Sequence, residues 1–132
     1  MRTEFFVHMV PPTVTHQEKK INFKGRTVYE PVELKSARQK LSDYIGPHRP
    51  DKPYSCGLRL VTKWCFPMGE KHRDGEYRTT KPDTDNLQKL LKDVMTANRF
   101  WKDDAIVASE VVEKFWAAVP GIYICIEELD GT

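Results

Sequence analysis

At 132 residues, with a net charge of +2 and 39% hydrophobic side chains, the chain has the size of one domain that can bury a core. Its three cysteines and four histidines show no Cys-x-x-Cys or Cys/His ligand spacing, which argues against a disulfide framework and against a zinc site. We see no signal peptide, transmembrane run or lipidation signal, so we expect a soluble cytoplasmic protein that does not contact a membrane.

The first part of the chain predicts a strand, a hairpin and a helix. The strand covers residues 4–9, and the hairpin joins residues 20–23 to residues 27–29. Pro31 then opens a helix at the first-turn position where proline is tolerated, and Gly46 ends it. The inner face of this helix is predicted to carry Leu34, Ala37, Arg38, Leu41, Tyr44 and Ile45.

Basic side chains concentrate in two stretches. One is the hairpin, and the other is the segment 67–80 together with Lys81. This segment has two glycines and no apolar periodicity, so we expect a mobile loop. Contacts with DNA phosphates are one interpretation of both stretches; a solvated hairpin tip and a disordered loop are the alternatives. The candidate DNA-binding residues are Lys19, Lys20, Lys24, Arg26, Lys71, Arg73, Arg78 and Lys81.

The remaining elements complete the predicted fold. Strands are expected at residues 56–66, 105–116 and 122–127, and the last two are expected to pair as a hairpin. A second main helix is expected at residues 84–97. The whole chain, residues 1–132, therefore predicts a single α+β domain with a mixed sheet of five or six short strands and two main helices.

The second helix has the clearest pattern in the sequence. Pro82 cannot lie inside a helix, so the helix begins after it and is capped by Asp83, Thr84 or Asp85. Asn98 ends it, because asparagine tolerates the left-handed geometry of a helix C-terminus. The apolar stripe of the helix is Leu87, Leu90, Leu91, Val94 and Met95.

Carboxylates gather in two short clusters around this helix, Asp83 with Asp85 and Asp103 with Asp104. The first pair is close enough to share one Mg²⁺, which prefers oxygen ligands. If the tertiary fold returned the second pair to the helix start, the cage would hold a metal that activates water and neutralises charge developing on a phosphate. Lys89, one turn along the helix from Asp85, would then contact the scissile phosphate. The alternatives are a helix cap, an exposed ion pair and a polar turn.

The charge distribution is uneven along the chain. Residues 1–82 contain 16 Lys and Arg against 9 Asp and Glu, a net charge of +7, whereas residues 83–132 contain 5 against 10, a net charge of −5. A basic half beside an acidic cluster suits a metal-dependent enzyme that acts on a polyanion. Simple solvation of these charges is the alternative, because sequence halves need not be spatial halves.

The motifs in this region resemble those of a known family. Lys-Pro-Asp-Thr-Asp-Asn-Leu-Gln-Lys at residues 81–89, then Asp93, then Phe-Trp-Lys-Asp-Asp at residues 100–104, then Lys114, stand in the order found in the RusA family of Holliday junction resolvases, small endonucleases often carried by prophages. The resemblance is specific over residues 81–114. It implies a RusA-like fold and a crossover junction endodeoxyribonuclease.

The resemblance also implies roles for single residues. Asp83, Asp85 and Asp104 match the family's metal-binding aspartates, and Lys89 matches its essential lysine. Asp103 matches a carboxylate beside the third aspartate, whereas Asp93 and Lys114 match recurring positions of unassigned chemistry.

The reaction that the resemblance implies requires Mg²⁺, with Mn²⁺ as a substitute, and no small-molecule cofactor. A homodimer would resolve four-way DNA junctions in recombination and repair by paired symmetric cuts. One departure concerns residues 66–80, which are longer than the short basic run expected before the first aspartate. A metal-dependent nuclease for other nucleic acid structures and a non-catalytic DNA-binding protein are the competing hypotheses.

Overall fold

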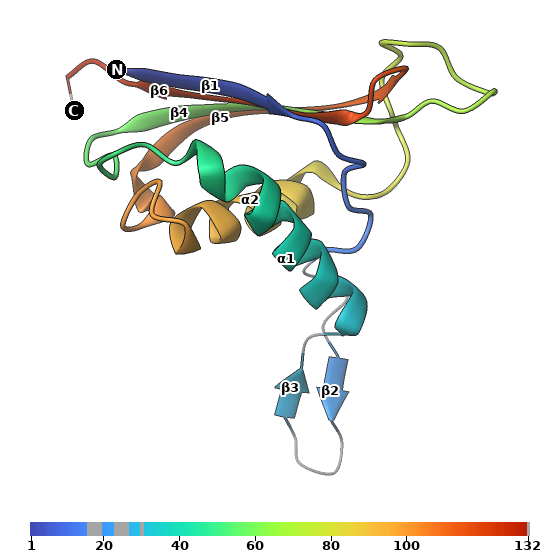
Figure 1. Cartoon of the computed structure of the whole chain (residues 1–132), viewed down its shortest axis with the longest axis horizontal. Coiled ribbons are helices and arrows are strands. Elements are labelled where there is room, and N and C mark those ends of the chain that lie inside the picture. Colours follow the sequence, from blue (N-terminus) through green and yellow to red (C-terminus); the bar gives the residue numbers. More distant parts are fainter. Residues whose placement is uncertain (16–19, 23–26, 30, 132) are drawn as a thin grey trace.

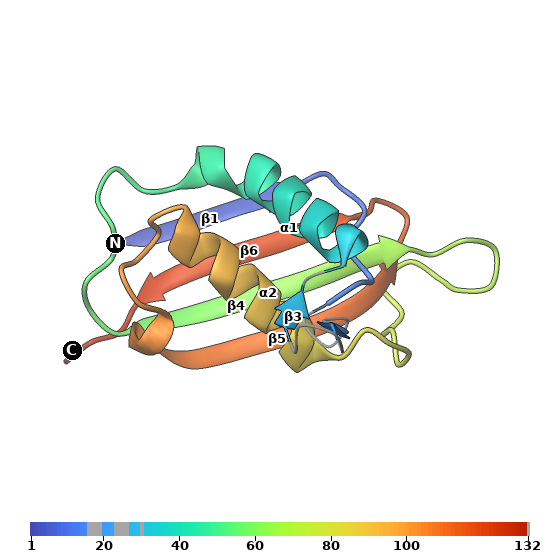
Figure 2. The same ribbon diagram turned by 90° about the horizontal axis from the view of Figure 1, so that it is seen from below.

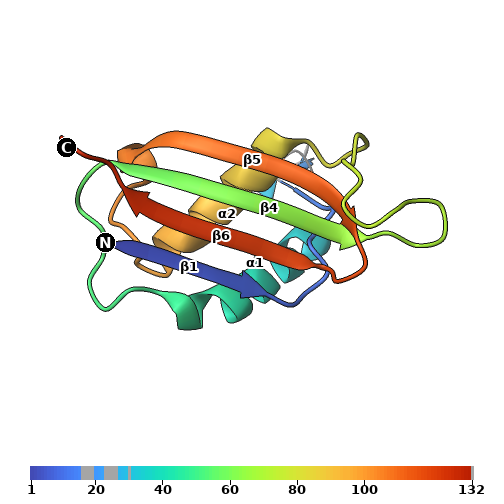
Figure 3. The ribbon, with the colours of Figure 1, turned by 90° about the horizontal axis from the view of Figure 1, so that it is seen from above.

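The centre of the protein is a four-stranded mixed sheet. The computed structural model describes residues 1–15, 20–22, 27–29 and 31–131. The sheet contains β1 (Arg2–Val7), β4 (Leu58–Pro67), β5 (Val107–Ala117) and β6 (Gly121–Glu128). Its order is β1-β6-β4-β5, in which β4 and β5 are parallel and the other neighbours are antiparallel. The α+β class and the mixed sheet are therefore as the sequence predicts, and Figure 3 shows the strand order.

Two helices cover one face of this sheet, α1 (Val32–Ile45) and α2 (Thr84–Ala97), as Figures 1 and 2 show. The boundaries of α2 are those predicted from its apolar stripe, and all five stripe residues are buried. The core between the layers also contains Trp64, Phe66, Phe100 and Trp101, each at most 1% exposed. No helix in the described part of the chain is long and apolar enough to cross a membrane.

The predicted number of strands in the sheet is too high. The hairpin strands β2 (Lys20–Asn22) and β3 (Thr27–Tyr29) do form, but they pair only with each other in a separate two-stranded sheet. Local alternation and turn signals predict a hairpin without showing which sheet it joins. The main sheet accordingly has four strands instead of five or six.

The expected final hairpin is wrong, because β4 lies between β5 and β6. The chain leaves β4, passes through α2 and returns as β5, and a helical crossover of this kind places parallel strands side by side. The other edge of β4 then pairs with β6, whose second edge pairs with β1. β6 is thus an inner strand, which agrees with the burial of Ile122, Ile124 and Ile126.

Two further details of the helices differ from the prediction. Tyr44 was assigned to the inner face of α1 but is 42% exposed, because it lies about 80° around the helix from the stripe set by Leu34. At the end of α2, Asn98 has a φ of −91° and Arg99 takes the left-handed conformation with a φ of 63°. Asn98 instead donates from Nδ2 to the Val94 carbonyl and to Ser42 Oγ, at 2.8 and 3.0 Å.

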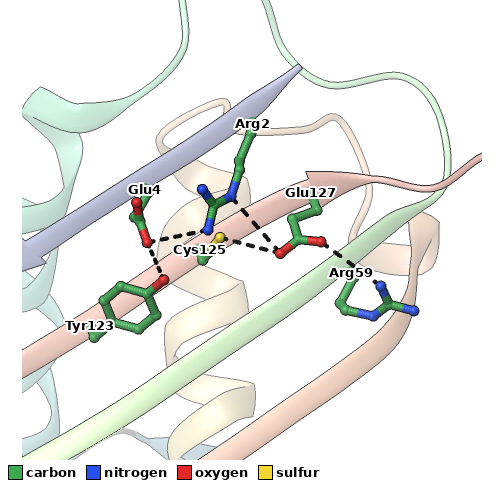
Figure 4. Close-up of polar contacts among 6 residues, drawn as sticks. All are labelled: Arg2, Glu4, Arg59, Tyr123, Cys125 and Glu127. Carbon is green, nitrogen blue, oxygen red and sulfur yellow. Dashed lines mark hydrogen bonds and ion pairs between the residues drawn. The ribbon is translucent and has the colours of Figure 1, made fainter.

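The outer face of the sheet carries a polar network on β1, β6 and β4 (Figure 4). Tyr123 donates a hydrogen bond to Glu4, and this bond is the main reason that the pKa of Tyr123 is raised. Arg2 lies 3.3 Å from Glu4, and Glu127 lies 3.8 Å from Arg59. Exposed pairs of this kind contribute little free energy, but they favour this strand register and suit a face in contact with water.

Gly121 allows β6 to begin directly against β1. A Cβ at this position would lie 2.2 Å from Cζ of Phe6 and 2.5 Å from the carbonyl oxygen of Val7. We expect Gly121→Ala to lower the free energy of unfolding by about 1–3 kcal/mol, because the backbone must move to admit the methyl group. Urea denaturation measures this change. Val119→Ala, at a 58% exposed position in the same connection, should alter stability by less than about 0.5 kcal/mol. A Gly121→Ala variant as stable as the wild type would contradict this close packing.

Candidate active site

Helix α2 begins with two exposed carboxylates. Asp83 is the N-cap residue: its backbone is extended, and its carbonyl oxygen accepts a hydrogen bond from the Leu87 amide at 3.1 Å. Its side chain makes no capping hydrogen bond, and Asp85 follows in the first turn. The positive end of the helix dipole favours negative charge here. The capping position is therefore as predicted, but the helix leaves the Asp83 carboxylate available as a ligand.

The chain that leads into Asp83 is held by two cationic side chains. Lys114 Nζ, from β5, donates to the carbonyl oxygens of Thr80 and Pro82, each at 2.7 Å. Between these two, the carbonyl oxygen of Lys81 accepts a hydrogen bond from Arg78 at 2.5 Å. Three consecutive carbonyls thus receive charge-assisted hydrogen bonds, which are stronger than neutral ones and fix the path of the backbone into α2.

Arg78 is itself enclosed by aromatic rings. Its guanidinium lies 4.3 Å from the ring centroid of Phe66 and 4.4 Å from that of Trp116. Cation–π contacts of this kind are favourable, and burial lowers the pKa of Arg78. On its other side, Trp116 stacks on His72 with ring centroids 4.1 Å apart. The segment before α2 is therefore attached to the ends of β4 and β5.

This attachment divides the basic residues expected in a mobile DNA clamp. Arg78 is engaged within the protein, whereas Lys71, Arg73 and Lys81 are exposed. The mobility of the segment and its contact with DNA stay predictions. Among the hairpin residues, Lys20 belongs to β2, whose side chains are not described, and Lys19, Lys24 and Arg26 lie outside the described residues.

A groove between α2 and β5, with a volume of about 420 Å³, brings together three of the predicted site residues, Asp85, Lys89 and Asp104. Asp85 and Lys89 lie along it on the helix, and Asp104 reaches it from the 3-10 turn η3 (Asp104–Ile106) that precedes β5. We call this site the α2–β5 groove. Its lining residues are Thr84, Asp85, Gln88, Lys89, Lys92, Asp104, Glu110 and Val112.

The other three acidic residues of the motif lie beyond this groove. Asp103 caps η3 by accepting a hydrogen bond from the Ala105 amide at 2.9 Å. Asp93 lies 3.9 Å from Arg38 and so links α2 to α1. Both line an adjoining hollow that shares Asp104 with the groove. Each therefore has a structural contact, and Asp83 lies outside the groove lining.

The carboxylates of the groove suit a divalent cation whose remaining ligands are supplied by water and the substrate. Asp85, Asp104 and Glu110 offer carboxylate oxygens along one groove, and Mg²⁺ is commonly held by one or two carboxylates with water and substrate phosphate oxygens. In the described part of the chain, no three His, Cys, Asp or Glu side chains are arranged to hold one ion. The described residues therefore do not form the cage of four carboxylates considered from the sequence. They do fit a site in which one or two carboxylates hold the cation.

Three polar residues of the groove, Gln88, Lys92 and Glu110, were not predicted as site residues from the sequence. Lys92 Nζ lies 2.8 Å from Glu110 Oε1, so this pair joins α2 to β5. Alternation along β5 was the available signal, because Glu110, Val112 and Lys114 share its inward face. Charged residues on the inner face of an edge strand, beside a helix that also carries charged residues, indicate a polar groove.

The packing of Arg78 predicts the behaviour of the segment before α2. Arg78→Ala should speed hydrogen exchange at the amides of Gly75 and Trp116 by roughly tenfold or more, because cation–π contacts and a charged hydrogen bond are lost together. Arg73→Ala, at an exposed position of the same segment, is the matched control and should leave both rates unchanged. Equal exchange in wild type and Arg78→Ala would show that Arg78 does not hold the segment.

Comparison with known proteins accords with this geometry. Residues 10–127 match the family model of the endodeoxyribonuclease RusA. The chain is 28% identical to the crossover junction endodeoxyribonuclease rusA of Lactococcus phage r1t, over 80% of this chain and 82% of the relative. It is 30% identical to the uncharacterized protein YqaN of Bacillus subtilis (strain 168), over 77% and 79% of the two chains. The chain is a nuclease that belongs to the RusA endodeoxyribonuclease family.

Proposed function

We propose that this nuclease requires a divalent metal and cuts four-way DNA junctions by paired, symmetric incisions in recombination and repair. The observation that carries the proposal is the α2–β5 groove, which places Asp85, Lys89 and Asp104 along one surface. Family membership supports cleavage of DNA, and similarity to the crossover junction endodeoxyribonuclease of the phage supports a crossover junction as the substrate.

The proposed roles follow from the chemistry of each side chain. Asp83, Asp85 and Asp104 are proposed as ligands of one or two metal ions, each held by one or two of these carboxylates, with Asp103 as an additional candidate. Mg²⁺, or Mn²⁺ in its place, would supply a Lewis acid that offsets negative charge developing on the phosphate. Lys89 contributes a positive charge one turn along α2 from Asp85, where it can bind a phosphate oxygen. The protein itself serves to position these groups against the DNA backbone.

Lys114 is proposed as a positioning residue for Asp83. Its ammonium group holds the two carbonyls on either side of Lys81, close enough to Asp83 for the two charges to interact. Burial and then the charge of Arg78 lower the pKa of Lys114, whereas Asp83 acts in the opposite direction. Lys114 matches a recurring position of the family, and the proposed role of this position is to hold the backbone that carries the carboxylate at the start of α2.

The substrate gives a physical reason to expect a homodimer. A two-fold junction needs two cuts on opposed strands, and a symmetric pair of subunits presents two identical sites with matching symmetry. The exposed residues Lys71, Arg73 and Lys81, together with the basic hairpin, are proposed to contact phosphates and to give affinity that depends on salt. We place the reaction in the cytoplasm of a bacterium or of a phage-infected cell.

Asp85→Asn tests the carboxylate site directly. The change keeps the side-chain size and removes the charge, so cleavage of a labelled four-way junction in Mg²⁺ should fall at least 100-fold. Binding to the junction should persist or tighten, because a negative charge near the phosphates is removed. Asp43→Asn, at a position on α1 where Asp43 accepts a hydrogen bond from Gln39, is the control and should cut normally. A chelator should abolish wild-type cleavage, and added Mg²⁺ should restore it.

Linear duplex assayed beside the junction separates the competing functions. Paired symmetric cuts confined to the junction support a resolvase. Equal cutting of both substrates would leave a metal-dependent nuclease without junction selectivity. Binding without cutting in any divalent metal, unchanged by Asp85→Asn, would overturn the proposed function and leave a DNA-binding protein.

Lys114→Met tests the positioning role. Loss of both carbonyl contacts should loosen the segment that carries Asp83, so half-maximal cleavage should need several-fold more Mg²⁺ while junction affinity changes little. Lys114→Arg retains the donors and should recover part of the loss. A purely structural lysine would leave the Mg²⁺ dependence of the folded variant unchanged, and that result would exclude the role proposed here.

A further inference from the structure

Gln88 has a buried donor group that the fold leaves unpaired. Its side chain is on α2, is 3% exposed and lines the α2–β5 groove. Among the buried side-chain nitrogen and oxygen atoms of the described residues, only Gln88 Nε2 has no hydrogen-bond partner. An amide donor shielded from water and left unpaired is costly, so its presence beside Asp85 calls for a partner.

A buried hydrogen-bond chain fixes the orientation of this amide. Trp64 Nε1 donates to Thr62 Oγ1 at 3.1 Å, and Thr62 Oγ1 donates to Gln88 Oε1 at 2.9 Å. The indole is only a donor, so the threonine hydroxyl accepts from it and directs its own proton to Gln88. The amide oxygen is therefore engaged, and both hydrogens on Nε2 are left for another acceptor.

The surroundings of Gln88 indicate which acceptor this is. Lys92 is already paired with Glu110 at 2.8 Å, whereas the neighbouring Lys89 is exposed. The groove therefore offers one cation and one neutral donor beside the carboxylate of Asp85. A neutral amide can bind a phosphate oxygen without repelling a divalent cation held nearby, which a further lysine would do.

We propose that Gln88 contacts the substrate, with its Nε2 donating to a non-bridging oxygen of a DNA backbone phosphate in the α2–β5 groove. The proposal rests on the proposed function and adds a residue to it. Lys89 supplies the countercharge for the same phosphate. Nε2 is covered in the DNA-free protein, so the contact requires the side chains around it to rearrange when the phosphate binds.

The test couples Gln88 to one phosphate of the substrate. Gln88→Met keeps the length of the side chain and removes the donor. Junction binding is measured with Ca²⁺ in place of Mg²⁺ so that the DNA stays uncut, on junctions with a single methylphosphonate at successive positions near the crossover. For the wild type, one position should weaken binding roughly tenfold or more, since a charged acceptor is lost. Gln88→Met should weaken binding to the unmodified junction several-fold, and the methylphosphonate at that position should then cost less than it costs the wild type, because only the Lys89 contact is left to lose.

Two controls separate this contact from a structural role. Gln39→Met, at an exposed position of α1, should behave as the wild type at every phosphate. Gln88→Met removes the unpaired donor Nε2 but also the acceptor of the Thr62 hydroxyl, so its melting temperature should stay close to that of the wild type. If it does not fold, Gln88→Leu replaces it as a second apolar variant.

The outcomes are distinct. Wild-type affinity in the folded Gln88 variant would overturn the proposal and make a fixed water the partner of Nε2. Weaker binding that is coupled to no phosphate would also overturn it, and would favour an acceptor on a base. A wild-type protein that binds no junction would instead overturn the proposed function, and this proposal with it.

Discussion

The packing of α2 on the sheet is the constraint on which the candidate site depends. Burial of its five stripe side chains contributes about 1.5–3 kcal/mol each, against a few tenths for an exposed ion pair. Apolar packing therefore sets the rotation of the helix, and the charged residues follow from it. Asp85 and Lys89 are directed along β5, and Asp93 toward α1. The parallel return of the chain as β5 then supplies the opposite wall of the groove.

The basic residues of the chain serve two different purposes. Arg78 and Lys114 are used inside the protein, where they bind three consecutive carbonyls ahead of Asp83. The rings of Phe66 and Trp116 enclose the guanidinium of Arg78 and so maintain this arrangement. A count of positive charges in the first part of the chain therefore overstates the surface available to DNA. It also conceals a scaffold that defines where α2 begins.

Most local features of the sequence were predicted well, whereas the order of the strands was not. The apolar stripe and Pro82 were sufficient to place the boundaries of α2, because both act within one helix. The order of β4, β5 and β6 depends on a crossover that no local pattern encodes, so the hairpin prediction failed. Gln88 was missed for a similar reason. Its importance arises from Thr62, which is 26 residues away in sequence and reaches it only across the core.

The central claim is that a divalent cation and a junction phosphate meet in the α2–β5 groove. Mn²⁺ titrated into isotope-labelled protein with uncut junction DNA tests this most directly, because the paramagnetic ion broadens the signals of nearby amides. The account predicts broadening centred on Asp85 and Asp104, and much stronger with the junction than without it, since the substrate completes the site. Broadening centred on the acidic residues of the outer sheet face, Glu4 on β1 and Glu127 on β6, and independent of DNA, would contradict it.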